Sequence, residues 1–184
     1  LGRRGGLTHT ALARLAELGD EIEEAIEPAE EEEVLRPEEM RVPLNTQRHD
    51  AVYQALLDLG ARSVIDLGCG HGQFLNRLVK TPAFSRIVGS DVSTRSLQYA
   101  ARRLHVDRMS ERQAERVELF QCALTYEDQR FTGFDAAVLM EVVEHVDTAR
   151  LEALERVVFG AAKPGAVLVT TTNCEYNPLY EGLV

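Results

Sequence analysis

The sequence has no apolar run of 18 residues, and no basic segment leads into an apolar stretch near its first residue. A helix that spans a bilayer needs about 20 consecutive apolar residues, so neither a membrane helix nor a secretory signal peptide is predicted. Cysteine is scarce, and its three positions, Cys69, Cys122 and Cys174, are far apart. An odd number at this spacing argues against a disulfide framework or a structural zinc site. We therefore expect a soluble protein with buried thiols, located in the reducing cytoplasm.

Lysine is nearly absent, because Lys80 and Lys163 are the only two among 20 basic residues. Arginine favours bidentate phosphate contacts, although biased codon usage explains the composition equally well. The net charge of −10 is unevenly distributed: residues 1–40 hold 12 acids and 4 bases, which leaves −2 for residues 41–184. The acidity therefore does not exclude a nucleic-acid partner for the larger part of the chain.

The chain divides into two parts by composition. Residues 1–40 contain the run EIEEAIEPAEEEE and are predicted to be an acidic linker or helical extension. Residues 41–184 are long enough for one globular domain. A helix is predicted over TQRHDAVYQALLDLG, with Val52, Leu56 and Leu59 on one face and Gly60 after its end.

Short apolar runs then alternate with helical patterns. Such alternation predicts right-handed βαβ units and an open, doubly wound, mostly parallel sheet of the α/β class. The predicted strands are SVIDL (63–67), RIVGSD (86–91), RVELF (116–120), DAAVLM (135–140) and AVLVTTT (166–172). The predicted helices between them cover residues 73–80, 94–105 and 149–159.

A glycine-rich loop, DLGCGHG, follows the first strand, and its glycines let a ligand approach the backbone closely. Asp91, at the end of the second strand, is placed to hold the two hydroxyls of a ribose. The spacing of Gly68, Gly70 and Gly72 departs from the G-x-G-x-x-G pattern of dinucleotide enzymes. It resembles the loop of class I (Rossmann-like) methyltransferases, which implies S-adenosylmethionine or its product S-adenosylhomocysteine as cofactor. Asp66 is then expected on the cofactor's ammonium side.

Two further positions are expected at this cofactor site. The adenine should lie over the loop CALTYED after the third strand, with Leu124 as part of an apolar wall. Val92, next to Asp91, is also predicted to contact the cofactor.

The segment EVVEH begins where the fourth strand ends, at the edge of the sheet where ligands bind in doubly wound folds. If the chain is helical there, Glu141, Glu144 and His145 share one face. Two crowded carboxylates repel unless a cation or a proton lies between them, and oxygen with imidazole ligands suits Mn²⁺ or Mg²⁺. A site without metal, in which His145 is a plain general base, remains the alternative.

From about residue 43 to 180 the sequence is similar to small-RNA 3′-terminal ribose 2′-O-methyltransferases of the Hen type, especially bacterial ones. The segments that carry the resemblance are PLNTQRHDAV, VIDLGCGHG, IVGSDVSTRSLQYAARRL, LTYED, MEVVEHVD, LERVVFGAAKPGAVLVTTTN and EYN. The resemblance implies methyl transfer to the 2′-hydroxyl at an RNA 3′ end. It also implies a metal bound by Glu141, Glu144 and His145, with His145 as a proton acceptor, and Asp66 and Asp91 at the cofactor.

Other implications of the resemblance concern binding partners. Arg48 matches the arginine of the family's L-N-x-x-R motif and is a candidate for the methionyl carboxylate or an RNA phosphate, or else for an ordinary ion pair. Thr171, Thr172 and Asn173 are expected to line the acceptor pocket, although Thr172 stands where the family has proline. RNA 3′ ends, with cleaved transfer RNA as one candidate, and a repair enzyme with kinase, phosphatase and ligase activities are the implied partners.

One departure from the family concerns a fourth metal ligand, a histidine that lies beyond Val184, as do the family's last two strands. The sheet is therefore expected to be incomplete at the C-terminus, with the fifth strand as an exposed edge. Two alternative functions stay open: a small-molecule O-methyltransferase, and a non-catalytic module that retains a cofactor pocket.

Overall fold

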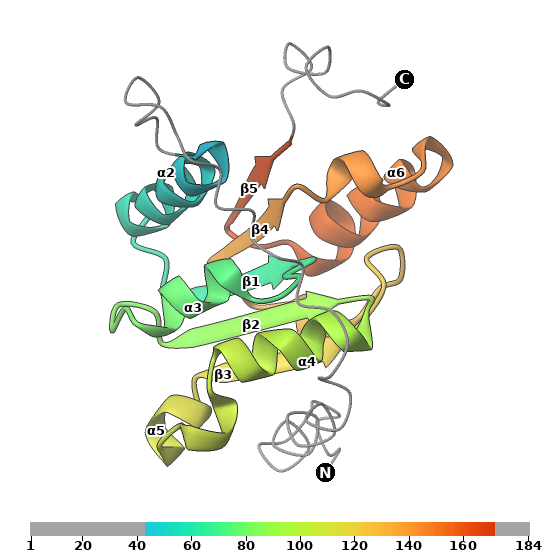
Figure 1. Cartoon of the computed structure of the whole chain (residues 1–184). Coiled ribbons are helices and arrows are strands. Elements are labelled where there is room, and N and C mark those ends of the chain that lie inside the picture. The colour runs from blue at the N-terminus through green and yellow to red at the C-terminus, as the bar shows by residue number, and fades with distance from the viewer. Residues whose placement is uncertain (1–42, 172–184) are drawn as a thin grey trace, which may run out of the picture.

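The structure, a computed structural model, describes residues 43–171, which form a central sheet with helices on both faces (Figure 1). Five strands pair in parallel in the order β3-β2-β1-β4-β5. Their bounds are β1 Ser63–Leu67, β2 Arg86–Asp91, β3 Val117–Gln121, β4 Ala136–Met140 and β5 Ala166–Thr170. The strand order reverses between β1 and β4, which is where doubly wound sheets bind ligands. The predicted fold class is therefore confirmed.

Helices connect the strands. The α-helices are α2 Leu44–Asp58, α3 Gln73–Val79, α4 Thr94–Arg103, α5 Glu111–Ala114 and α6 Thr148–Glu155. The 3-10 helices are η2 Val106–Arg108, η3 Gln129–Phe131 and η4 Val143–His145, and η5 Arg156–Ala162 is a π-helix. Within residues 43–171, none of these helices combines the length and the hydropathy needed to cross a membrane.

Several predicted boundaries differ from the observed ones. The helix predicted over 94–105 ends at Arg103, because His105 has a left-handed backbone with φ 51°. Leu59 was predicted on the buried face of α2, but it follows the last helical residue and is 55% exposed. Gly60, with φ 65°, turns the chain toward β1 as predicted. The predictions for residues 1–40 and for Thr172, Asn173 and Cys174 fall outside the described residues.

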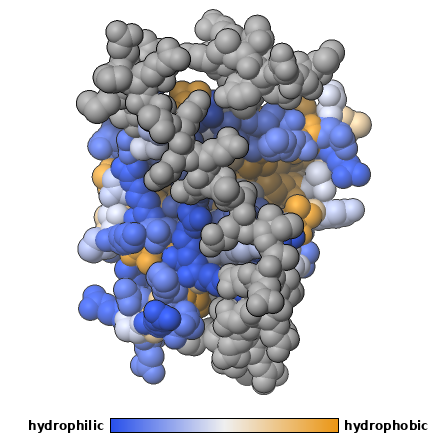
Figure 2. Space-filling model, in the orientation of Figure 1, coloured by the Kyte–Doolittle hydropathy of each residue, from blue (hydrophilic) through white to orange (hydrophobic). Residues whose placement is uncertain are grey.

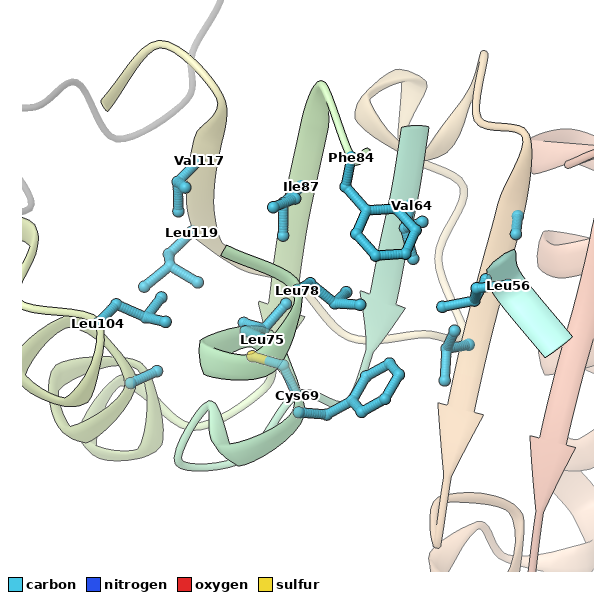
Figure 3. Close-up of a cluster of buried hydrophobic side chains, with 14 of the residues drawn as sticks. Leu56, Val64, Cys69, Leu75, Leu78, Phe84, Ile87, Leu104, Val117 and Leu119 are labelled. Carbon is cyan, nitrogen blue, oxygen red and sulfur yellow. The ribbon is translucent and has the colours of Figure 1, made fainter. Parts of the chain in front are cut away.

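Two apolar clusters cover the two faces of the sheet. On one face α2, α3 and α4 pack on the strands, and Leu56, Leu75 and Leu78 are fully buried there (Figure 3). On the other face, residues of α6 and η5 pack against Ile65 and Phe120. Burying a leucine fully contributes about 2 kcal/mol, so these clusters fix the sheet firmly. The clusters cover the faces of the sheet, so a polar site can form at the carboxyl ends of the strands.

Candidate active site

The loop after β1 has the shape that its glycines predict. Gly68, Gly70 and Gly72 have φ values of 87°, 52° and 72°, in the left-handed region that favours glycine. A Cβ atom on Gly68 would lie 2.6 Å from Cγ2 of Val142, and one on Gly72 would lie 2.9 Å from Cβ of Ala100. The loop therefore tolerates no larger residue at either position.

Asp91 holds this loop in place. Its Oδ2 accepts a hydrogen bond from the Gly70 N–H at 2.9 Å, and its Oδ1 accepts one from the Ser93 N–H at 2.8 Å. The same carboxylate thus joins the glycine loop to the start of α4. Each oxygen still has a further lone pair for a ligand, so the prediction that Asp91 contacts a ribose stays a prediction. Next to it, Val92 is 67% exposed.

Asp66 lies within β1 and is only 2% exposed. Burial, and after it the negative charge of Asp91, raises its pKa to about 7. A buried carboxyl group with such a pKa changes charge near neutral pH and can ionise when a cationic group lies beside it. This environment suits the cationic ligand predicted for Asp66.

A cavity of about 340 Å³ opens beside the glycine loop at the carboxyl ends of β1 and β4. It brings together three predicted cofactor residues, Asp66, Gly68 and Gly70, with Glu141 from the EVVEH segment. The remaining lining residues are Asn45, His49, Cys69, His71, Gln73, Phe74 and Met140. Leu124 does not line this cavity and instead packs, half-buried, against the cluster under α6.

Glu141 has a backbone conformation that the helical interpretation did not anticipate. Its φ is 53°, so it lies outside any helix, and its N–H donates to the Thr170 carbonyl at 3.1 Å. Its Oε1 accepts a hydrogen bond from the Thr170 hydroxyl at 3.0 Å, and its Oε2 lies 3.0 Å from Nη1 of Arg48. Because the side chains of Arg48 and Glu141 are 19% and 27% exposed, this ion pair is partly shielded from water.

Glu144 and His145 follow in the short helix η4, and both are exposed. The three residues therefore do not share one helical face as the helical interpretation expected. Within residues 43–171, no group of three or more His, Cys, Asp or Glu side chains is already arranged to hold a metal ion. The donor chemistry of two carboxylates and an imidazole still fits a hard divalent cation, so these three ligands stay a prediction.

His49 lines the cavity although the sequence does not single it out, because it is not accompanied in the sequence by a pair of glutamates as His145 is. Its ring packs edge-on against Phe74 at 5.5 Å. Burial mainly, and then the charge of Arg77, lowers the pKa of His49, while Asp50 opposes them. The imidazole is therefore neutral at physiological pH.

Helix α2 brings His49 to the cavity and Arg48 to Glu141, and side-chain contacts hold it there. Arg77 forms an ion pair with Asp50, and its guanidinium lies 4.1 Å from the Tyr53 ring centre. The Tyr53 hydroxyl is 2.9 Å from the Thr81 hydroxyl, within hydrogen-bond distance. These contacts place α2 over the site that the strands create.

Comparisons with known proteins agree with this arrangement. Residues 65–168 match a family model described as a methyltransferase domain. The chain is similar to the small RNA 2′-O-methyltransferase of Rattus norvegicus, with 32% identity over 167 residues that cover 89% of this chain and 41% of the relative. The small RNA 2′-O-methyltransferase of Schizosaccharomyces pombe is 32% identical over 149 residues, which cover 77% of this chain and 39% of that protein.

Solved structures are similar as well. The methyltransferase domain of bacterial CtHen1 is 47% identical with a TM-score of 0.72, covering 76% of this chain and 72% of that one. The small RNA methyltransferase HEN1 is 26% identical with a TM-score of 0.69, covering 80% of this chain and 19% of that one. A glycopeptide N-methyltransferase, at 17% identity and a TM-score of 0.53, shares the class I fold alone. The chain spans about two fifths of the rat and yeast relatives' length.

Proposed function

The chain belongs to the methyltransferase domain family, and within it to the bacterial Hen1 type, and from this premise we propose that it methylates the 3′-terminal ribose of RNA. The methyl group passes from S-adenosylmethionine to the 2′-oxygen. One observation supports the proposal above others: the glycine loop and Asp66 open onto the same cavity as Glu141. A cofactor-type loop and a carboxylate for the acceptor thus lie side by side.

In this proposal Asp66, Gly68, Gly70 and Asp91 bind the cofactor, with Val92 and Leu124 near its adenosine part. The buried Asp66 carboxylate attracts the ammonium group, and the backbone of the loop approaches the ligand closely. S-adenosylhomocysteine is the product that leaves the same site.

The transfer itself is an in-line displacement. The bond between the methyl carbon and the sulfonium sulfur breaks as the bond from that carbon to the 2′-oxygen forms, and neutral S-adenosylhomocysteine leaves. In this proposal the 2′-hydroxyl proton passes to His145, which is exposed on η4, four residues after Glu141. Arg48 takes an anionic group, the methionyl carboxylate or an RNA phosphate. The protein contributes mainly alignment.

Glu141, Glu144 and His145 are the residues that would hold Mn²⁺ or Mg²⁺. A divalent cation held there would lower the pKa of the ribose hydroxyl and so would make its oxygen more reactive. Mn²⁺ binding to the protein, measured from the loss of the free-ion electron paramagnetic resonance signal, tests these ligands without any assay of activity. Glu144→Gln should weaken binding at least ten-fold, while the exposed Glu152→Gln on α6 serves as the matched control. Equal affinities in all three proteins would reject the assignment.

Labelled cofactor and short RNAs test the reaction. Label should enter the 2′-oxygen of an RNA that ends in a 3′-hydroxyl, and should not enter matched RNAs that end in a 3′-phosphate or a 2′-deoxyribose. Equal transfer to the 3′-phosphate RNA would contradict recognition of the terminal diol. Transfer to a catechol and not to RNA would instead indicate a small-molecule methyltransferase.

The cellular setting belongs to the same proposal. We place the enzyme in the cytoplasm, consistent with the free thiols of Cys69 and Cys122. Its substrates are RNA 3′ ends, such as those of cleaved transfer RNA, and it acts in RNA repair beside an enzyme with kinase, phosphatase and ligase activities. Co-purification of the full-length protein with such an enzyme tests this setting.

A further inference from the structure

One face of α4 carries a set of side chains that the proposed reaction does not use. The helix turns Leu97, Ala100 and Ala101 into the core, where all three are buried. Arg95, Tyr99 and Arg102, spaced four and three residues apart, share another side of the helix. We call these three residues, together with His71 of the glycine loop, the α4 face.

The side chains of the α4 face contact one another around Tyr99. The His71 ring lies 4.7 Å from the Tyr99 ring, centre to centre. The guanidinium carbons of Arg95 and Arg102 lie 5.7 and 5.9 Å from the same ring centre, and Arg95 donates a hydrogen bond to the Tyr99 hydroxyl at 3.3 Å. A half-buried aromatic ring is thus held among two cationic groups and an imidazole.

The charge of this region is opposite to that of the chain. Across residues 92–110 the arginines at 95, 102, 103 and 108 accompany a single acid, Asp107, although the whole chain carries −10. Within residues 43–171, Arg95 contacts Tyr99 and forms no ion pair with a carboxylate. The region therefore attracts a polyanion. In the view of Figure 2 the visible coloured surface includes both hydrophilic and hydrophobic residues.

The α4 face begins at the cavity. His71 lines that cavity together with Asp66 and Glu141, and α4 starts three residues after Asp91 of β2. From Arg95 to Arg102 the helix advances about 10 Å at about 1.5 Å per residue. That length matches about three stacked bases at about 3.4 Å each. A strand whose end occupies the cavity can therefore continue along this face.

We infer that the α4 face binds the single-stranded RNA that immediately precedes the terminal nucleotide. Bases stack on Tyr99 and His71, and the exposed guanidinium group of Arg95 contacts a phosphate. The inference rests on the proposed function for the position of the RNA end, and it adds the surface that holds the rest of the strand. Aromatic rings between cationic groups suit any base sequence, since every base presents a flat face.

The test measures binding of the full-length protein to a fluorescent single-stranded RNA of twelve nucleotides at several salt concentrations. Arg95→Gln should weaken binding about five-fold at 0.1 M salt, because one phosphate contact changes the slope of log affinity against log salt by about 0.7. Tyr99→Leu should weaken binding about ten-fold and leave that slope unchanged, because stacking involves no counterion release. His71 lines the cavity and is therefore left intact.

Arg156→Gln at the start of η5 is the matched control, because it removes one exposed arginine from an element on the opposite face of the sheet from α4. Its affinity and salt slope should equal those of the unmodified protein. The inference is overturned if Arg95→Gln and Tyr99→Leu bind like the unmodified protein, or if Arg156→Gln loses as much affinity. Circular dichroism of each variant checks that it folds.

Methyl transfer by the same proteins separates this inference from the proposed function. The α4 variants should raise KM for the twelve-nucleotide RNA and leave kcat unchanged, because neither Arg95 nor Tyr99 lines the cavity. If the unmodified protein methylates RNA ends and the variants match it in KM, the inference alone fails. If the variants lose RNA binding but the unmodified protein never methylates a terminal ribose, the proposed function alone fails.

Discussion

The replacement Asp66→Asn should stabilise the cofactor-free protein at high pH. The folded state keeps a proton on Asp66 up to about pH 7, since burial and the charge of Asp91 raise its pKa. The unfolded chain releases that proton near the ordinary pKa of 3.8. The favourable contribution of the protonated group is thus complete below pH 3.8 and is lost as the pH rises to about 7. At about 1.4 kcal/mol for each pH unit, the loss reaches about 4 kcal/mol.

Urea unfolding of the two cofactor-free proteins at pH 5 and pH 8 measures this effect. The difference in unfolding free energy between Asp66→Asn and the unmodified protein should move by about 3 kcal/mol in favour of the variant across this range. Other ionisable groups cancel in the difference, and the exposed Asp58→Asn provides a matched aspartate-to-asparagine control. A difference between Asp66→Asn and the unmodified protein that stays constant from pH 5 to 8 would refute the reasoning.

Cofactor binding should show the opposite dependence. If the ionised Asp66 carboxylate holds the cofactor's ammonium group, affinity should fall about ten-fold for each pH unit below 7. The Asp66→Asn protein should bind weakly at every pH. Calorimetric titration with S-adenosylhomocysteine measures both.

Three further perturbations follow from contacts in the site and the sheet. Gly68→Ala should cost about 2 kcal/mol more in thermal unfolding than Gly133→Ala, because both glycines have positive φ but only Gly68 faces Val142 at 2.6 Å; equal losses would contradict the clash. Asp135→Ala should cost about 1 kcal/mol at pH 7, because its carboxylate accepts hydrogen bonds from the Arg62 and Ser63 N–H groups. These bonds lower the pKa of Asp135. The stability that its carboxylate contributes is therefore present above pH 3.8 and is lost as the pH falls through the lowered pKa. Urea unfolding should thus show a smaller loss of stability in Asp135→Ala at pH 3 than at pH 7. A double-mutant cycle of Arg48→Met and Glu141→Gln should give a coupling of about 1 kcal/mol in urea unfolding, and a coupling of zero would mean that the pair adds nothing to stability.

The sequence predicts the sheet well because central parallel strands are buried on both faces. The run AAVLM is apolar without interruption, and SVIDL is apolar except for Ser63 and Asp66; such runs are typical of strands that are covered on both faces. The glycine loop is equally predictable, since three glycines at this spacing permit a turn that other residues cannot adopt. The strands and the glycine loop are predictable because each depends on residues that are adjacent in the sequence.

The features that the sequence does not predict depend on residues far apart in the chain. Arg48 and Glu141 are 93 positions apart, so their ion pair follows only from the way α2 packs over β4. Glu141 adopts a left-handed backbone where glycine is usual, and no residue pattern indicates it. His49 lies at the cavity because α2 packs on α3 there, where the His49 ring contacts Phe74 and lies near Arg77.

The ion pair between Arg48 and Glu141 connects α2 to the end of β4. A positive group that binds the Glu141 carboxylate in place of Arg48 breaks one of the contacts that hold α2. Occupancy of the site and the mobility of α2 are therefore linked. Fewer restraints on α2 would speed amide hydrogen exchange in its first turns, at a distance from the bound ligand. The rate of hydrogen exchange in α2 should therefore report whether a positive group is bound in the cavity.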